Sequence, residues 1–197
     1  VLAHALTRLW LASRQIRHIA RHADAVPIDF SQSVGLAEHR KAASYSLAQL
    51  KLGLVDVTFD ALVLLAWTLL GGLHALNQWL LTLMPEGVWQ QITLVLAFVL
   101  IGGLLHLPIS LVETFVIEQR FGFNRTTPGL WISDMVKGVV LGLVLGVPIL
   151  WVVLQLMAAG GPWWWLWAWA AVVVFQLFVM WIAPNVIMPL FNKFTPL

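Results

Sequence analysis

Two hydrophobic stretches of the sequence carry ionisable side chains at helical spacing. In the first stretch, steps of three, four or seven residues separate Asp56, Asp60, Trp67, His74, and Asn77 or Gln78. In the second, the same steps separate His106, Ser110 and Glu113. Each set therefore shares one helical face. Because ionisable groups at membrane depth usually face a bundle interior or a wet cavity, we predict that Asp60, His74 and His106 face a cavity; plain interhelical hydrogen bonding is the alternative.

A zinc-protease helix needs two histidines four residues apart, with a glutamate directly after the first as general base. The sequence contains no His-Glu-x-x-His motif. His18 and His22 have the spacing, but Ile19 stands where the glutamate is needed and arginines surround the pair. That pattern is more typical of a basic helix at a membrane interface. No phosphate-binding loop and no Ser/His/Asp or Cys/His set stands out, so the residues by themselves make no complete active site and no metal site.

The composition excludes a water-soluble fold. Hydrophobic residues make up 60% of the chain, charged residues only 10%, and the mean hydropathy is +0.88. A soluble domain has about 25% charged residues. The net charge of +2 is too small and too scattered for a nucleic-acid surface, and the absence of cysteine excludes disulfides and thiolate metal ligands.

The elements that carry these residues are predicted to be transmembrane helices in an all-α, polytopic bundle. Hydrophobic stretches long enough to cross a bilayer predict about four complete spans, at 57–83, 88–112, 133–158 and 163–183. A helix over 2–21 is predicted to leave the membrane. Residues 1–13 carry His4 and Arg8 and are interpreted as the end of a preceding span.

Proline and glycine suggest where these helices end, bend and pack. Turns are predicted at 85–87 and 160–162, Pro148 is expected to kink its span, and Pro184 and Pro189 are expected to interrupt the last one. Thr127 and Pro128 suit the cap and first position of a helix. Small residues at spacing four predict a close helix approach along one stripe, which consists of Gly138, Gly142 and Gly146.

Loop charges predict the orientation, since short loops rich in Lys and Arg stay cytoplasmic. All interhelical basic residues fall on one side, so we predict that segments 14–56 and 113–132 and the C-terminal tail, including Arg40, Arg125 and Lys193, are cytoplasmic. Glu86 and Gly161 are predicted to lie on the opposite side, where the tryptophans preferred at headgroup level cluster: Trp79, Trp89, Trp163, Trp164 and Trp165.

Two long blocks and one shorter run resemble a known family. Residues 113–127 (ETFVIEQRFGFNRTT), 183–197 (APNVIMPLFNKFTPL) and 11–17 (LASRQIR) are similar to the N-terminal membrane region of the type 1 CAAX prenyl proteases, in particular to bacterial members. These are membrane-embedded zinc metalloendopeptidases. The resemblance implies a larger ring of helices that encloses a water-filled chamber, with a zinc site near its cytosolic side, and a bacterial inner (plasma) membrane location.

The resemblance also implies which part of the full-length enzyme binds zinc and which part forms the membrane region. The zinc-binding motif is expected in a domain after residue 197, so residues 1–197 are expected to bind no zinc and to be inactive alone. They are expected to supply the chamber wall and substrate path of the full-length protease. The implied partners are the lipid bilayer, a peptide or protein substrate, and the downstream domain, with no nucleic acid. A transporter or channel, or a structural membrane module, is the alternative that the polar stripes leave open.

Candidate residues for the cleft or substrate path follow from the two blocks. They are Glu113, Glu118, Arg120, Asn124, Asn185 and Asn192. The glutamates are expected to orient ligands or substrate, and Arg120 to pair with one of them. A solvated connecting loop is the simpler alternative, but the phenylalanines on both sides of Gly122 predict a segment packed against something.

Overall fold

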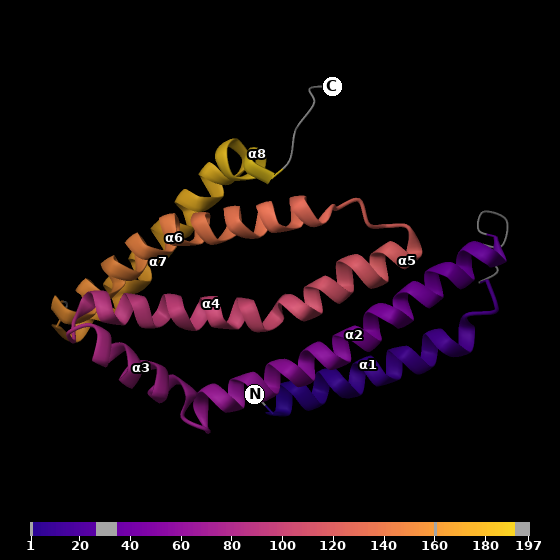
Figure 1. Ribbon diagram of the computed structural model, residues 1–197, viewed down its shortest axis with the longest axis horizontal. Helices are drawn as coiled ribbons and strands as arrows, with labels where there is room; N and C mark the ends of the chain where they lie inside the picture. The colour runs from indigo at the N-terminus through magenta and orange to yellow at the C-terminus, as the bar shows by residue number, and fades with distance from the viewer. Residues whose placement is uncertain (1, 27–34, 160, 192–197) are drawn as a thin grey trace. The chain divides into compact units, whose positions relative to one another are not determined.

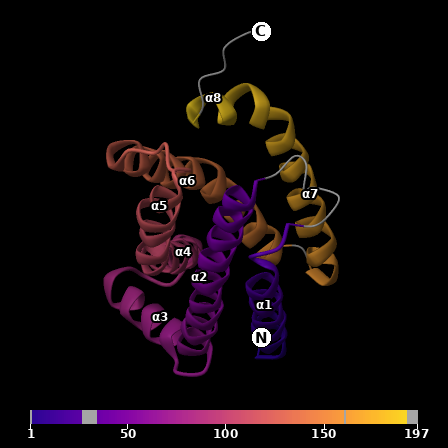
Figure 2. The same ribbon diagram turned by 90° about the vertical axis from the view of Figure 1, so that its right-hand side faces the viewer.

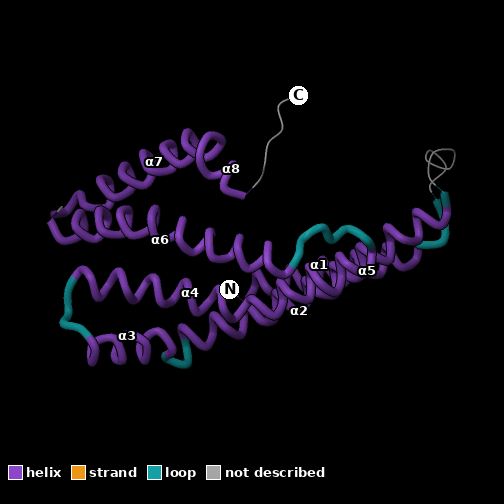
Figure 3. Tube along the Cα trace, turned by 45° about the horizontal axis from the view of Figure 1, so that its top comes forward, coloured by secondary structure: helices purple, strands orange, loops and turns teal. Residues whose placement is uncertain are grey.

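The computed structural model describes residues 2–26, 35–159 and 161–191 (Figure 1). Within these ranges the chain contains helices and no strand (Figure 3). The longer elements are α1 (Leu2–His22), α2 (Leu36–Thr68), α3 (Gly72–Leu83), α4 (Val88–Val112), α6 (Pro128–Ala159) and α7 (Trp164–Ile182). The shorter ones are η2 (Glu113–Glu118), α5 (Gln119–Phe121), η3 (Gly161–Trp163), η4 (Ala183–Ile187) and α8 (Met188–Phe191). The predicted all-α fold is confirmed.

The chain divides into two compact units, one made of residues 1–76 and 100–125 and the other of residues 77–99 and 126–197. In the first unit α1 lies alongside α2 (Figures 1 and 2). The π-helix η2 also packs on α2. Ala5 and Ala43 are buried in this unit, and their small side chains allow the helices to approach closely. In the second unit α6 and α7 form a hairpin (Figure 3).

The length and hydropathy of the helices confirm the membrane class. Among the described residues, three helical stretches are long and apolar enough to cross a membrane: Val88–Phe121, Pro128–Ala159 and Gly161–Phe191. A fourth span results if α2 and α3 are counted together. Large apolar side chains are exposed along all of them, such as Leu104 and Val174 at 61% and 66%. Exposed apolar surface on this scale is suited to lipid, not water.

The first predicted span is not one continuous helix, because it breaks after Thr68 and turns by 53° into α3. Gly71 has φ of +77°, a left-handed conformation that costs L-residues about 1–2 kcal/mol. A Cβ on Gly72 would lie 2.9 Å from the carbonyl oxygen of Ala66. The Gly71 carbonyl accepts the hydrogen bond of Ala75 N–H at 2.8 Å, so the new helix begins immediately. The span predicted over 57–83 is therefore a bent pair of helices, because a glycine pair makes a tight turn possible.

The predicted interruption by the prolines at the end of the chain is a change of helix type and not an end of the helix, because α7 ends at Ile182 and a π-helix follows at once. Pro108 and Pro148 lie inside α4 and α6, and the helix continues through Pro184 and Pro189 as η4 and α8. Proline is tolerated in membrane helices because local adjustments satisfy the freed backbone groups, and η4 is such an adjustment, a π-helical turn.

Two predictions about helix starts and packing had opposite outcomes. Helix α6 begins at Pro128, and the Oγ1 of Thr127 accepts a hydrogen bond from Leu130 N–H at 3.3 Å, which confirms the cap. The stripe of Gly138, Gly142 and Gly146 does not meet a helix in the described part of the chain, because a Cβ added there would have nothing within 4 Å. Instead, the α3–α4 connection is tied by the buried Gln90, whose Nε2 donates to Asn77 Oδ1 at 2.7 Å.

Candidate functional site

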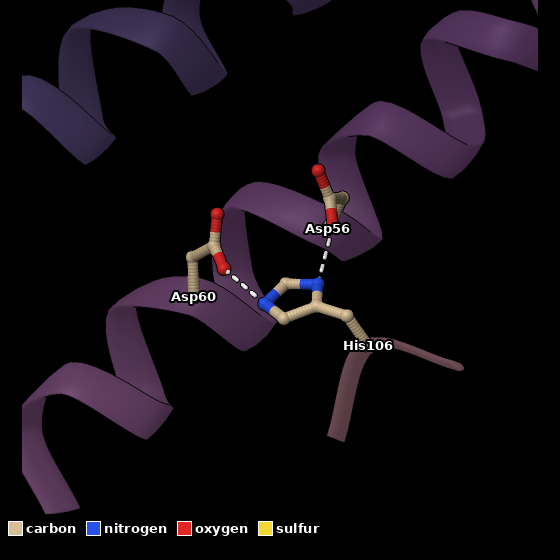
Figure 4. A group of neighbouring side chains, drawn as sticks. All are labelled: Asp56, Asp60 and His106. Carbon is tan, nitrogen blue, oxygen red and sulfur yellow. Dashed lines mark ion pairs between the residues drawn. The ribbon is translucent and has the colours of Figure 1, made fainter. Parts of the chain in front are cut away.

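The polar stripes of α2 and α4 meet at one point in the first unit (Figure 4). His106 Nε2 lies 2.8 Å from Asp60 Oδ1, and His106 Nδ1 lies 3.5 Å from Asp56 Oδ1. The first distance is that of a good hydrogen bond, whereas the second is at the limit of one. Phe59 packs edge-on against the imidazole, with ring centroids 5.5 Å apart. We call this group the Asp–His–Asp cluster.

The helical repeat explains how the sequence builds this cluster. Asp56 and Asp60 are four residues apart, so they lie one turn from each other on the same face of α2. His106 reaches both from α4, which makes the contact the interhelical bonding that the sequence left as an alternative. The side chains stay partly accessible, at 38% for His106 and 53% for Asp60. His74 lies on α3, is exposed, and does not belong to the cluster.

The cluster does not fit the catalytic zinc that the family resemblance implies. Its possible ligand atoms lie within 4.8 Å of one another. However, the two carboxylates face different nitrogens of a single imidazole, and those nitrogens point in diverging directions. A catalytic zinc needs three ligands that converge on one ion and leave one position open. We therefore interpret the cluster as a polar interaction that links α2 and α4, and we derive no metal chemistry from it.

A second candidate region is the segment 113–125, whose residues 113–121 continue α4 instead of forming the predicted loop. Residues Glu113–Glu118 form a π-helix and α5 extends the helix to Phe121. The helix ends at Gly122, whose φ is +79°. The freed carbonyl of Glu118 accepts hydrogen bonds from Phe123 N–H at 2.9 Å and Asn124 N–H at 3.2 Å. This turn fixes the segment after α5 without a side-chain cap.

The aromatic residues around Gly122 pack against α2, which confirms the predicted packing and identifies its partner. The rings of Phe121 and Phe123 lie edge-on against Tyr45, at centroid distances of 5.4 and 4.8 Å. Gln49 Nε2 donates to the Tyr45 hydroxyl at 3.0 Å, which holds that ring in place. Lys41 Nζ lies 5.5 Å from the centroid of Phe123. We call Tyr45, Phe121 and Phe123 the aromatic anchor.

The charged residues of the segment are positioned by this anchor but do not pair as predicted. Within the described ranges, neither Glu113 nor Glu118 forms an ion pair with Arg120. The Arg120 guanidinium instead lies 5.8 Å from the ring centroid of Phe121. Both glutamates are half-buried and Arg120 is exposed. Asn124 is half-buried and takes part in a further interaction of its own.

The last predicted site residues belong to the second unit. Asn185 is exposed within η4, the π-helix Ala183–Ile187. Asn192 lies outside the described residues. Each of the two blocks that carry the family resemblance thus contains a π-helical turn. Such turns occur frequently at functional sites, since they redirect the side chains of an otherwise regular helix.

Sequence reasoning missed two contributors to these sites. Tyr45 was passed over in a polar stretch, although it is the single tyrosine of the chain and could have been singled out for that reason. Asp56 was placed on the polar stripe but not among the candidates, and its place one turn before Asp60 was the available signal.

Comparison with known proteins supports the family resemblance. Residues 15–193 match the family described as CAAX prenyl protease N-terminal, five membrane helices. The human CAAX prenyl protease 1 homolog is 32% identical over 98% of this chain and 42% of that protein. The rice homolog is 43% identical over 64% of this chain and 28% of that protein. The chain therefore spans less than half the length of these curated relatives.

A solved structure shows the same fold. The crystal structure of Ste24p from S. mikatae aligns with all of this chain and 47% of its own chain, at 28% identity and a TM-score of 0.91. These comparisons do not favour the transporter or channel alternative. Because the family description covers most of the chain, the chain belongs to the CAAX prenyl protease family and corresponds to its N-terminal membrane region.

Proposed function

We propose that this chain is the membrane region of a zinc metalloendopeptidase that cleaves membrane-associated or CAAX-type substrates. The match over residues 15–193 and the names of the relatives carry the proposal. In this proposal the zinc ligands come from a domain that follows residue 197; its support is the family resemblance, together with the greater length of the relatives, of which the chain covers 42% and 47%. Zinc in such a domain would activate a water molecule for attack on the peptide carbonyl. Residues 1–197 would supply the chamber wall and the path of the substrate.

In this proposal the segment 113–125 borders the cleft. The aromatic anchor and the Gly122 turn hold Glu113 and Glu118 on a rigid support. Both carboxylates remain partly accessible and form no ion pair among the described residues, so they are available to orient a substrate or a zinc ligand. Residues that orient ligands in this way typically change activity by about 10- to 100-fold when replaced.

The test replaces each charged group conservatively in the full-length protein. Glu113→Gln, Glu118→Gln and Arg120→Lys are assayed for peptide cleavage and for thermal stability in detergent. At least one glutamine variant is expected to lose about tenfold or more of its turnover with an unchanged melting profile. Glu86→Gln, an exposed residue of the 84–87 turn, is the matched control and should keep full turnover. Near-normal turnover in all three variants would mean that the segment 113–125 only connects helices and has no functional role.

The proposed chamber-facing role of Asp60, His74 and His106 needs a separate measurement. Because the chain has no native cysteine, His74→Cys and His106→Cys give single labelling sites. Both should react in intact protein with a small water-soluble thiol reagent. Leu104→Cys, at a position exposed to lipid by our interpretation, is the control and should react slowly. Equal rates at 104 and 106 would contradict a wet cavity.

We also propose that the protein lies in a bacterial plasma membrane with Arg40, Arg125 and Lys193 on the cytoplasmic side. The support for the orientation is the one-sided distribution of basic residues, whereas the bacterial location rests on the family resemblance alone. Single cysteines at Glu86 and Arg125 should label from opposite sides of intact cells with an impermeant reagent. Labelling of both from the same side would refute this orientation.

A further inference from the structure

The Asp–His–Asp cluster offers acidic partners to both nitrogens of one imidazole. Asp60 Oδ1 lies 2.8 Å from Nε2 of His106, and Asp56 Oδ1 lies 3.5 Å from Nδ1 (Figure 4). A neutral imidazole has one N–H, and its other nitrogen presents a lone pair. With a neutral ring, one of the two contacts would therefore set a lone pair against a carboxylate oxygen. Both contacts are attractive at once only when the cluster holds a second proton.

Other histidines of the first unit show what a single proton can serve. Nδ1 of His22 lies 2.8 Å from the carbonyl oxygen of His18, and Nε2 of His39 lies 3.0 Å from the carbonyl oxygen of His22. In the contacts between described residues, each of these two rings faces one acceptor, which the single N–H of a neutral imidazole can satisfy. His106 differs from them because it faces two acceptors and both are carboxylates.

The charge balance of the region also favours a second proton on His106. The cluster lies on α2 and on the membrane-span candidate Val88–Phe121, and charges at membrane depth are costly unless they are paired. With a neutral ring, Asp56 and Asp60 would bring two negative charges to this site. A doubly protonated ring reduces the net charge of the cluster from two negative charges to one.

The remaining negative charge has a counterion on α1. A cavity of about 130 Å³ lies between α1 and α2, and His4, Arg8 and Asp60 are the ionisable residues that line it. No ion pair joins Arg8 to Asp60 among the described residues, so the cavity separates the two charges. A polar cavity holds a water molecule once it offers about 10–15 Å³, so water can bridge them. With Arg8 included, the network has no net charge.

The two contacts of His106 respond differently to loss of the second proton. The contact with Asp60 is short, so it keeps the one remaining N–H, on Nε2. The lone pair of Nδ1 is then directed at Asp56, whose contact is already at the limit of a hydrogen bond. Asp60 is therefore the permanent partner of His106, and Asp56 is a partner only while the ring carries two protons.

We propose that the Asp–His–Asp cluster binds a proton that locks α2 to α4. With the proton bound, both aspartates hold the imidazolium; without it, Asp56 repels the ring and the two helices separate locally. Helix α4 continues without a break into η2, and Glu113 follows His106 by two helical turns. The lock therefore acts on the support of the segment 113–125. The lock itself does not depend on the proposed protease function.

The first measurement identifies the proton. Full-length protein labelled with ¹⁵N-histidine is studied by NMR between pH 5 and 9, on both sides of the ordinary histidine pKa of about 6.5. The signal of His106 is assigned by its loss in His106→Phe. We expect a ring with two N–H groups at the acidic end of this range. A ring that is neutral over the whole range would overturn the proposal.

The second measurement follows the lock by the distance between the two helices. Spin labels are attached to Val55→Cys on α2 and Leu104→Cys on α4, which are 58% and 61% exposed, after any cysteine outside residues 1–197 is replaced by serine. The distance distribution should shift to longer values when the ring loses its second proton. His106→Phe, which removes both N–H groups, should show the longer distance at every pH.

Asp56→Asn is the decisive variant. An asparagine amide can donate to the lone pair of a neutral ring and accept from a protonated one, so the contact exists in both states. The distance between the labels should then be the same at both ends of the pH range. Asp134→Asn, the same substitution in the second unit, and His74→Gln, which removes an exposed histidine of α3, are the matched controls and should keep the full response.

Two further results would contradict the lock. If the distance in His106→Phe equals that of the unsubstituted protein at pH 5, the proton on His106 does not hold the helices together. If Asp56→Asn responds to pH as strongly as the Asp134→Asn control, the response arises at another titrating group and not from the contact between Asp56 and His106.

Discussion

Two Gly-Gly pairs in the first unit have opposite effects on the chain. Gly71-Gly72 ends α2 and starts α3 at a 53° angle, whereas Gly102-Gly103 lies inside the continuous α4. At the first pair, Gly71 is left-handed and Gly72 approaches the carbonyl of Ala66. At the second pair, a Cβ would meet nothing within 4 Å. A Gly-Gly pair therefore permits a helix break but does not cause one. The helix breaks at the pair where a glycine closely approaches another part of the backbone.

The prolines behave differently from Gly71-Gly72, because none of the prolines within the predicted spans ends a helical segment. Four prolines, at 108, 148, 184 and 189, lie within helical segments that continue past them. The one break inside a predicted span occurs at glycines, with no proline nearby. In a membrane helix a lost hydrogen bond can be compensated locally, but the left-handed Gly71 ends the helix and changes the direction of the backbone.

The largest effect is expected for Gly72→Ala. The added methyl would lie 2.9 Å from Ala66 O and 3.1 Å from a ring carbon of Trp67, so the turn must open. Overpacking of this kind costs about 1–3 kcal/mol, which thermal unfolding in detergent can measure. A melting temperature equal to that of the unsubstituted protein would mean that the close approach does not hold the break in place.

A smaller loss is expected for Gly122→Ala. The φ of Gly122 is +79°, which is as unfavourable for an L-residue as the φ of Gly71. A Cβ at Gly122, however, would meet nothing within 4 Å. Only the left-handed conformation is penalised, at about 1–2 kcal/mol. Gly122→Asn should cost less than alanine, because asparagine visits this region more readily. Equal stability of the two variants would argue against a left-handed residue at this position.

The smallest effect, with the opposite sign, is expected for Gly103→Ala. The position is helical and open, so alanine should stabilise α4 by about 0.5–1 kcal/mol through its lower conformational entropy cost. The measurement is the same melting experiment. A loss of stability would show that another part of the complete protein packs against Gly103 and that the contrast between the two pairs is weaker than described.

The sequence alone predicts much of this fold because the bilayer imposes simple rules. Uncharged stretches gave the spans, and Thr127 with Pro128 gave the start of α6. The break at Gly71 could not be predicted, since hydropathy and helical period do not reveal which glycine adopts a positive φ. The two π-helices were missed for a related reason: they depend on how one residue is accommodated in a turn, which no composition pattern shows.

The candidate site was predicted in part. Asp60 and His106 were chosen from helical spacing, and the structure brings them together. Spacing fixes which residues share a face of one helix, but not which faces of two helices meet. For that reason His74 was grouped with them although it lies apart on α3, and Tyr45 was missed although it anchors Phe121 and Phe123.

The π-helical turn at Glu113–Glu118 also constrains the length of the chain at that point. Deleting one residue there would restore a regular helix and rotate everything that follows by about 100°. Phe121 and Phe123 would then turn away from Tyr45, and the Gly122 turn would point elsewhere. An insertion or deletion in the exposed connection at 84–87 would shift no such register, because α4 starts anew after it. The number of residues in this block is therefore constrained as strongly as their types.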